Sequence, residues 1–351
     1  MNSDVNVSIS VVIVARNEEK NIAACLHSII NQTYPENLFE IILVNDHSSD
    51  GTVSIAESFK KKTIRIINLK DFTGITRLNS YKKIAIAQAI SIAKGNLIVT
   101  TDADCIVPTL WLETLAGFYE QNDFVFIAAP VVYLDPLPDE PLFKRLLKNF
   151  QTLDFLTLQG ITGASVHKRF HNMCNGANLA YTKEVFIEVS GFEGIDDIAS
   201  GDDMLLMQKI QKFHPLGIGF LKSGNAVVET LPADTIKGFL NQRIRWASKT
   251  GKYSDPKITG VLVLVYLFNV SIFIAAFCAF FSLPSFYLFI ILLLVKTLAE
   301  LFFLLPVARF FGKQNLLWWF APAQPFHILY TIIAGWLGKF GSYKWKGRKV
   351  K

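Results

Sequence analysis

Two aspartates behind an apolar run are the residues best suited to chemistry. Asp102 and Asp104 are one residue apart and directly follow the Ile-Val-Thr-Thr run at residues 98–101. In an extended or turning backbone both carboxylates can reach one hard cation, because Mg2+ and Mn2+ bind oxygen ligands and bridge to substrate phosphates. Aspartates are also common in turns, which is the simpler account of such a pair alone. Its position behind a strand-like run favours a Mg2+ or Mn2+ site that serves a diphosphate leaving group.

Asp46 occupies the same kind of position in another segment. It follows residues 40–45, which form an apolar run, and it could accept a hydrogen bond from a nucleobase N–H. The alternative for this segment is helix capping, a task that Ser49 or Asp50, just before Thr52, would perform well. Both can hold, with Asp46 functional and Asp50 structural.

Charged residues further along the chain could complete a site for group transfer. Asp202 and Asp203 precede an apolar helical run. One could therefore cap the helix while the other lies in a cleft as general base for an acceptor hydroxyl. Arg245 could stabilise the charge of a departing diphosphate, and Trp246 offers a flat face to a sugar ring. The alternative for the last two is an interfacial tryptophan beside a snorkelling arginine.

The elements that must position these residues alternate between short apolar runs and helical patterns. We predict strands at residues 8–15, 40–45, 64–68 and 96–101, and helices at residues 20–31, 52–61, 82–93 and 111–121. Short strands separated by helices of about a dozen residues predict a parallel sheet flanked on both faces. Ligands of such sheets bind at the carboxyl ends of the strands, which is where Asp46 and Asp102 are expected.

Taken in order, these segments resemble the family 2 inverting glycosyltransferases, which have a GT-A fold. The match begins with a strand and an Arg-Asn-Glu-Glu stretch within residues 11–19, and an Asp-x-Ser-x-Asp-x-Thr segment follows at residues 46–52. The DxD pair, the acidic pair and a QxxRW segment at residues 242–246 complete it. Each motif alone is modest, but the set has ordinary family spacing and covers about residues 8–246.

The resemblance implies a metal-dependent, hexosyltransferase-type enzyme that uses a nucleotide-diphosphate sugar, with a UDP-sugar as the expected donor. It implies an α/β fold of the GT-A class, in which a mixed, mostly parallel sheet is flanked by helices and followed by C-terminal transmembrane helices. Lys82 or Lys83 resembles a basic residue near the donor, without the usual glycines around it, and we predict Lys83. The implied roles are base contact for Asp46, diphosphate and metal binding for Asp102 and Asp104, catalysis for Asp203 beside Asp202, donor binding for Gln242 and Arg245, and acceptor binding for Trp246, Gly176 and Asn178.

The carboxyl-terminal part of the chain predicts membrane segments. Hydrophobic residues make up 51% of the sequence and concentrate after residue 257. Residues 258–281 and 286–305 are each long enough to span a bilayer, and within the second Lys296 and Glu300 can pair because they are four apart on a helix. A third segment at residues 316–337 is broken by prolines and either spans or re-enters the membrane. We therefore predict a cytosolic catalytic domain at residues 1–257 with interfacial helices near 142–158 and 234–250, a membrane domain at 258–338, and a basic tail at 339–351.

The net charge of +6 comes from that tail. It carries six basic residues and no acid, and the other 29 of the 35 basic residues match the 29 acids. Basic residues beside Tyr343 and Trp345 suit a membrane surface and argue against a nucleic-acid partner. The four cysteines have no paired or metal-type spacing, which favours a reduced compartment. We predict a multi-pass protein of the inner cell membrane whose catalytic domain faces the cytosol.

Three other functions are weighed against transfer of one sugar to a membrane lipid or lipid-linked glycan. Processive polysaccharide synthases usually carry membrane helices before the catalytic domain, and nothing membrane-like precedes residue 8 here. The intact acidic set argues against a catalytically inactive scaffold that binds nucleotide sugars. A transporter built on Lys296 and Glu300 is disfavoured by the small number of spans. Single addition to a lipid acceptor is therefore the expected activity.

Overall fold

The described residues fall into two compact units. The structure is a computed structural model of the chain, and it describes residues 6–72, 80–170, 173–196, 198, 201–249, 256–340, 343–345 and 348–350. The first unit contains residues 1–131 and 162–231, and the second contains residues 132–161 and 232–351. This division differs from the predicted boundary at residue 257, because residues 132–161 and 232–257 belong to the same unit as the apolar helices.

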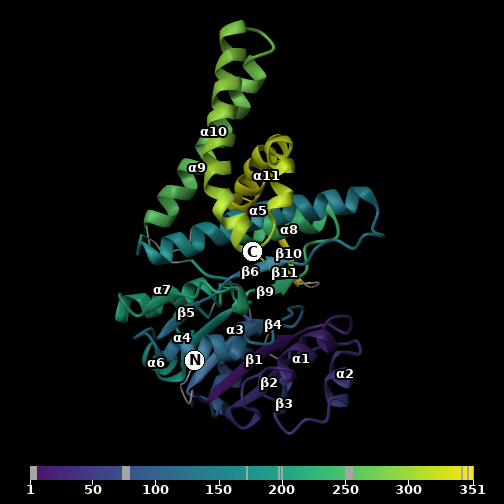
Figure 1. Cartoon of the computed structure of the whole chain (residues 1–351), viewed down its shortest axis with the longest axis vertical. Helices are drawn as coiled ribbons and strands as arrows, with labels where there is room; N and C mark the ends of the chain where they lie inside the picture. Colours follow the sequence, from purple (N-terminus) through teal and green to yellow (C-terminus); the bar gives the residue numbers. More distant parts are fainter. Residues whose placement is uncertain are drawn as a thin grey trace. The chain divides into compact units, whose positions relative to one another are not determined.

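The first unit is built on a mixed, mostly parallel sheet of seven strands (Figure 1). In spatial order the strands are β3 (Ile64–Asn68), β2 (Phe39–Asn45), β1 (Ile9–Ala15), β4 (Leu97–Asp102), β7 (Leu179–Thr182), β5 (Phe126–Ala128) and β8 (Ile218–Phe220). Strand β7 runs antiparallel to both of its neighbours, whereas the other pairs are parallel. All four predicted strands are confirmed, and so is the predicted fold class.

The strands read as apolar runs because the central ones are covered on both faces. Helix α3 (Tyr81–Ile92) packs on β1 and β2, and its Ala85 and Ala89 join Val12 and Ile42 in one buried cluster.

The other helices of this unit are α1 (Ile22–Ile30), α2 (Thr52–Ser58), α4 (Trp111–Glu120), α6 (Lys183–Glu188) and α7 (Met204–Phe213). The unit also contains short 3-10 turns at Glu36–Leu38, Leu69–Asp71 and Gly224–Ala226, and a further strand, β9 (Val228–Thr230).

The order of the strands reverses direction beside β1. The chain passes from β1 outward to β2 and β3, then returns to β4 on the opposite side of β1. Such a reversal of strand order is the place where open α/β sheets bind ligands, just outside the carboxyl ends of the strands. The residues that end β1 and β4 therefore frame the expected binding site.

The second unit consists mainly of long helices. They are α5 (Leu142–His167), whose last residues belong to the first unit, α8 (Ile236–Ala247), α9 (Pro256–Cys278), α10 (Leu283–Phe310) and α11 (Phe320–Phe340), with a 3-10 segment at Gln314–Trp319. Strand β6 (Val131–Tyr133) lies at the junction of the units. In the tail, β10 (Tyr343–Trp345) and β11 (Arg348–Val350) pair antiparallel, whereas Lys346 and Lys351 lie outside the described residues.

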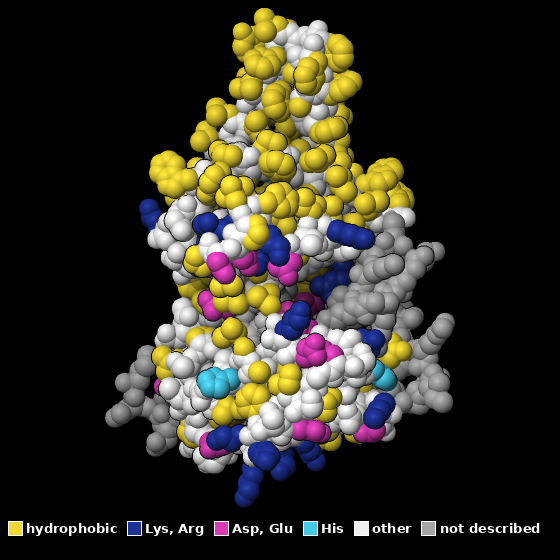
Figure 2. All heavy atoms as spheres, turned by 90° about the vertical axis from the view of Figure 1, so that its right-hand side faces the viewer, with side chains coloured by type: hydrophobic (Ala, Val, Ile, Leu, Met, Phe, Trp, Pro, Cys, Tyr) yellow, Lys and Arg dark blue, Asp and Glu magenta, His cyan; other side chains and the backbone are white. Residues whose placement is uncertain are grey.

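Two helices are long and apolar enough to cross a membrane. They are α9, with 23 residues, and α10, with 28, and they correspond to the first two predicted spans. Apolar side chains cover their surface, and Phe302 is 82% exposed (Figure 2). Among the described residues no other helix meets the same length and hydropathy limits, and the third predicted segment folds as the 3-10 turn and α11, with Pro325 inside the helix. That this segment either spans the membrane or re-enters it remains a prediction.

Helix α5 continues well past the predicted end at residue 158. The helix continues through Gly160, where the missing side chain lets α5 approach α10 closely. A Cβ at Gly160 would lie 2.6 Å from Cγ2 of Val307 and 3.1 Å from the ring of Phe303. The sequence pattern could not distinguish such a packing glycine from a helix end.

Gly160→Ala should therefore destabilise the protein, although alanine favours a helix. We expect overpacking of about 1–3 kcal/mol to outweigh the roughly 0.5–1 kcal/mol that alanine gains over glycine. Gly260→Ala is the matched control, since a Cβ there meets nothing within 4 Å. Thermal unfolding in detergent should show a lower midpoint for the first variant and an equal or higher midpoint for the second. Equal midpoints for the two variants would contradict the close packing of α5 on α10.

Candidate active site

A lysine joins two carboxylates where β4 ends. Asp102 is the last residue of β4, opposite Val14 of β1, and so lies where the strand order reverses. Its Oδ1 accepts a hydrogen bond of 2.8 Å from Nζ of Lys82, which also lies 3.0 Å from Oδ2 of Asp202. The Lys82 side chain comes from the first turn of α3, and Asp202 immediately precedes Asp203 at the start of α7. Three segments distant in sequence thus meet around one ammonium group.

The carboxylates keep this lysine charged. Burial by itself disfavours the charged form, but the negative charges of Asp102 and Asp202 outweigh it and raise the pKa of Lys82. The first turn of a helix is an unfavourable place for a cation, because the helix dipole is positive there. The ammonium group is therefore held by the acids and not by its own helix, and it is placed where an anionic ligand would meet it.

Asp203 connects the same cluster to a neighbouring loop. It is the N-cap residue of α7, where its Oδ1 accepts the N–H of Met204 at 2.7 Å, while its Oδ2 accepts the N–H of Gly176 at 3.2 Å. A Cβ at Gly176 would lie 3.5 Å from both the Asp202 carboxylate and the Lys82 ammonium. Asp203 is thus the acid that caps the helix, and Asp202 contacts the lysine, while the role of general base remains a prediction.

Asp46 lies at the end of β2 and is only 1% exposed. Its Oδ1 is 3.0 Å from Nδ1 of His47 and 3.7 Å from Nη1 of Arg16, which also donates to the Asp46 carbonyl. The loops after β1 and β2 hold each other, and Asn17 and His47 both have positive φ, at 53° and 56°. Such backbone conformations cost free energy and tend to cluster at binding sites. Base contact by Asp46 remains a prediction.

Asp50 has the structural role that the sequence suggested. Its Oδ1 accepts the backbone N–H of Thr52 at 3.1 Å and the Thr52 hydroxyl at 2.5 Å, while its Oδ2 accepts the N–H of Glu19. Burial would raise the pKa of Asp50, but these hydrogen bonds outweigh it and lower the pKa. Asp50 thus fixes the start of α2 and the loop that follows β1.

Two residues predicted for the site have other partners in the structure. Lys83 is buried, and its Nζ donates to the carbonyls of Ile195 and Ile198 at 2.5 and 2.8 Å. Asn178 is 0% exposed, accepts the Trp111 indole N–H, and donates to two carbonyls. Each secures a loop, and the cation that reaches the carboxylates is Lys82.

The sequence contained a signal for this choice between adjacent lysines. Lys83, Ile86 and Ile90 are spaced three and four residues apart, so they share one face of α3, and that face is buried. Lys82 is rotated by about 100° from it and faces the end of β4. Helical periodicity would therefore have predicted Lys82, and not Lys83, as the basic residue near the sugar donor.

The oxygen ligands of Asp102 and Asp104 fit a divalent cation of the magnesium class. Neither residue is buried, and the donor set contains only oxygen, which hard cations prefer. Within the described ranges no group of three or more His, Cys, Asp or Glu side chains is arranged to hold a metal ion. Magnesium usually binds through one or two carboxylates together with substrate phosphates and water, so two aspartates are a sufficient protein contribution.

The QxxRW segment lies on α8 in the second unit. Oε1 of Gln242 accepts hydrogen bonds from Nη1 of Arg243 at 2.8 Å and from the Tyr133 hydroxyl at 3.2 Å. The Arg243 guanidinium lies 4.2 Å from the centre of the Trp246 ring. Arg245 is half-buried on the same helix. The carboxylate cluster belongs to the first unit, whereas this segment belongs to the second.

Comparison with known proteins identifies the family to which the chain belongs. The sequence matches glycosyl transferase family 2 over residues 10–173 and glycosyl transferase family group 2 over residues 97–337. The second match covers more than half of the chain, and the chain belongs to the family 2 group of glycosyltransferases.

Relatives and one solved structure extend over much of the chain. The sequence is 24% identical over 332 residues to the dolichyl N-acetyl-α-D-glucosaminyl phosphate 3-β-D-2,3-diacetamido-2,3-dideoxy-β-D-glucuronosyltransferase of Methanococcus voltae, covering 86% of this chain and 92% of the relative. It is 25% identical over 246 residues to the poly-β-1,6-N-acetyl-D-glucosamine synthase of Staphylococcus epidermidis, covering 68% and 53%. The mannosyltransferase PcManGT from Pyrobaculum calidifontis, in complex with GDP-Man and Mn2+, has a TM-score of 0.50 at 20% identity, over 93% and 91% of the two chains. Other curated relatives match over only 34% or 18% of their own length.

Proposed function

We propose that this protein transfers a sugar, with inversion, from a nucleotide-diphosphate sugar to a membrane lipid or lipid-linked glycan. The observation that carries the proposal is the contact of Lys82 with Asp102 and Asp202 at the carboxyl end of β4. An ammonium group between carboxylates at the end of that strand suits a diphosphate that arrives with a divalent cation. Membership of the family supplies the reaction type.

The proposed roles distribute binding and proton transfer over the named residues. Asp102 and Asp104 would hold Mg2+ or Mn2+, which when bound supplies positive charge to the diphosphate oxygens. Lys82 donates to the same anionic group, and Asp203, with Asp202 beside it, accepts the proton of the acceptor hydroxyl. Asp46 contacts the base.

The remaining contacts come from the QxxRW segment and from one loop. Gln242 and Arg245 bind the diphosphate, because amide and guanidinium N–H groups donate to its oxygens. The family resemblance assigns acceptor binding to Trp246 and to Gly176. A tryptophan ring suits the apolar face of a sugar, and a glycine leaves room beside the acid that accepts the proton.

A lipid-linked acceptor is favoured by the length of one match. The similarity to the Methanococcus voltae enzyme, whose name contains a dolichyl phosphate-linked sugar, extends over 86% of this chain. Processive polymer synthesis is the second candidate, supported by the similarity to the Staphylococcus epidermidis synthase over 68% of the chain. In both cases α9 and α10 would anchor the enzyme in the membrane with the catalytic unit on the cytosolic side.

A donor screen with the purified protein tests the proposed function. UDP- and GDP-sugars should be supplied with membrane lipid extract, and release of nucleoside diphosphate should be measured. We expect release that depends on lipid extract and stops when EDTA removes divalent cations. The product should be a discrete glycolipid. A long polymer would favour the processive alternative, and no release with any donor would favour the inactive scaffold.

A further inference from the structure

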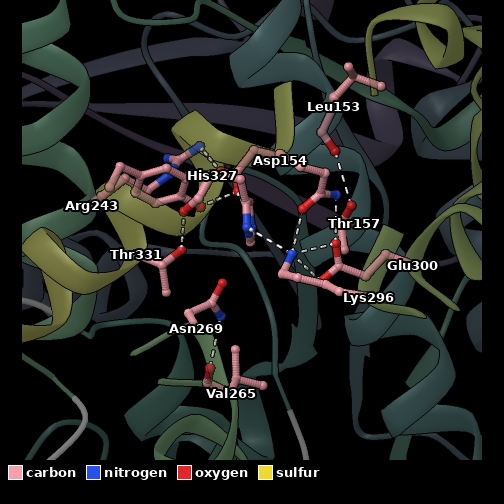
Figure 3. Close-up of polar contacts among 12 residues, drawn as sticks. Leu153, Asp154, Thr157, Arg243, Val265, Asn269, Lys296, Glu300, His327 and Thr331 are labelled. Atoms are coloured by element: carbon pink, nitrogen blue, oxygen red, sulfur yellow. Dashed lines mark hydrogen bonds and ion pairs between the residues drawn. The ribbon is translucent and has the colours of Figure 1, made fainter. Parts of the chain in front are cut away.

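A chain of polar contacts crosses four helices of the second unit (Figure 3). It begins at Arg243 on α8, continues to Asp154 on α5 and His327 on α11, and ends at Lys296 and Glu300 on α10. Asp154, Arg243 and Lys296 are all buried. Buried charges persist only where they are paired and hydrogen-bonded, so each of these groups depends on the next for its place in the unit.

Asp154 fixes the guanidinium group of Arg243. Its Oδ2 lies 2.8 Å from Nε and 2.6 Å from Nη2 of that arginine. Its Oδ1 accepts a hydrogen bond from the Tyr330 hydroxyl of α11 and lies 3.7 Å from Nε2 of His327. Both oxygens of the carboxylate are therefore engaged, and α5 and α11 together determine where the guanidinium lies.

Arg243 in turn determines the orientation of the Gln242 amide. A guanidinium group can donate hydrogen bonds but cannot accept them, so the atom 2.8 Å from Nη1 must be the amide oxygen. The Tyr133 hydroxyl donates to the same oxygen. With Oε1 fixed in this way, the amide NH2 of Gln242 points away from Arg243 and presents two donors, and the described residues place no hydrogen-bond partner on it.

The same guanidinium also holds Trp246, one turn further along α8. It lies over the indole ring at 4.2 Å from the ring centre, a distance that suits a cation–π contact. Phe155, next to Asp154 on α5, approaches the ring from α5 with a centroid distance of 6.2 Å. One arginine thus positions two residues of the QxxRW segment.

We propose that Asp154 is a positioning residue for sugar transfer, which acts through Arg243 to orient the Gln242 amide and the Trp246 ring. The inference rests on the proposed function, in which Gln242 contacts the diphosphate and Trp246 the acceptor. Tyr330 connects this arrangement to α11, and the contacts of His327 extend it to Lys296 on α10. The geometry of the QxxRW segment therefore depends on helices that follow it in the sequence.

A paired substitution separates this role from stability. Asp154→Asn alone would leave the Arg243 charge buried without a counterion, and the protein could lose its fold. Asp154→Leu with Arg243→Met removes both charges, and apolar replacement of a buried ion pair is often neutral or stabilising. The matched control is Asp135→Asn, which removes a carboxylate 2.6 Å from Lys313 in the same unit. The unfolding midpoint, kcat and both KM values should be measured for each protein.

We expect the Asp154→Leu/Arg243→Met variant to keep its unfolding midpoint and lose about tenfold or more in kcat, because charge on the diphosphate grows in the transition state. Asp135→Asn should match the wild type. In a Gln242→Ala/Trp246→Ala background, the same pair of substitutions should change kcat by less than about twofold, since their targets are gone. Wild-type kcat in the paired variant, or equal losses in both backgrounds, would overturn the inference. Lack of transfer by the wild-type protein would overturn the proposed function instead.

Discussion

Lys82→Met should lower kcat by about 10²–10³-fold, the effect typical of removing one preorganised group that stabilises transition-state charge. Without the ammonium group, Asp102 and Asp202 would face the diphosphate with their negative charge uncompensated. Initial rates of nucleoside diphosphate release at saturating donor and acceptor measure the loss. Lys82→Arg keeps the charge and should retain a larger share of the activity than Lys82→Met.

The adjacent lysine provides a discriminating comparison. Lys83→Met removes the donor for the carbonyls of Ile195 and Ile198, and we expect it to lower the free energy of unfolding by about 1–3 kcal/mol. Its folded fraction should still turn over. Lys209→Met is the control for the general effect of a lysine substitution on stability and turnover, because Lys209 also donates to backbone carbonyls in the same unit. If Lys83→Met abolished turnover in folded protein while Lys82→Met did not, the donor contact would belong to Lys83.

Asp203→Asn should lower kcat by about 10²–10⁴-fold, the usual contribution of a general base. Folding should be preserved, because asparagine is as good an N-cap residue as aspartate and its oxygen can accept the Met204 N–H. The substitution therefore removes the basicity of the carboxylate and keeps the bond to Met204, while the weaker bond from the Gly176 N–H loses its acceptor. Turnover and the unfolding midpoint should be measured on the same preparation, and donor binding should be retained.

Two variants with the same chemical change serve as comparisons. Asp50→Asn alters a carboxylate that also accepts backbone N–H groups, but in the α2 turn, so its kcat should stay close to that of the wild type. Asp202→Asn removes one partner of Lys82 but leaves the ammonium group paired with Asp102, so it should lower kcat less than Lys82→Met. An active Asp203→Asn together with an inactive Asp202→Asn would assign the base role to Asp202.

Most of the sheet could be predicted from the sequence because its central strands are buried on both faces. Val11, Ile42 and Val99 lie in uninterrupted apolar runs, and short runs of this kind between helical patterns are typical of buried strands. The short strands β5, β7 and β8 contain three or four residues each and are paired by distant partners, so no local pattern indicates them. The end of α5 was not predictable either, because the presence of a glycine at position 160 is explained only by the close contact of α5 with α10, which lies far along the chain.

The candidate site was predictable where chemistry and strand ends coincide. Asp46 and Asp102 follow apolar runs, and the rule for parallel sheets places them at the ligand edge. The contact of Lys82 with Asp202 was not predictable in the same way, because the two residues are far apart in the sequence. Asp154 carried no signal at all, since an aspartate in the middle of an amphipathic helix is ordinarily solvated and here is buried against Arg243.

The contact of Lys296 with Glu300 bears on how α10 could enter a bilayer during synthesis. The two groups are 2.7 Å apart and lie on one helix, so they can neutralise each other as soon as that helix forms. Gln324 and His327, which also contact Lys296, belong to α11 and emerge from the ribosome later. A membrane helix that carries its own counterion does not need the next segment for insertion, and the later side chains need only complete the hydrogen bonding around a pair that is already electrically neutral.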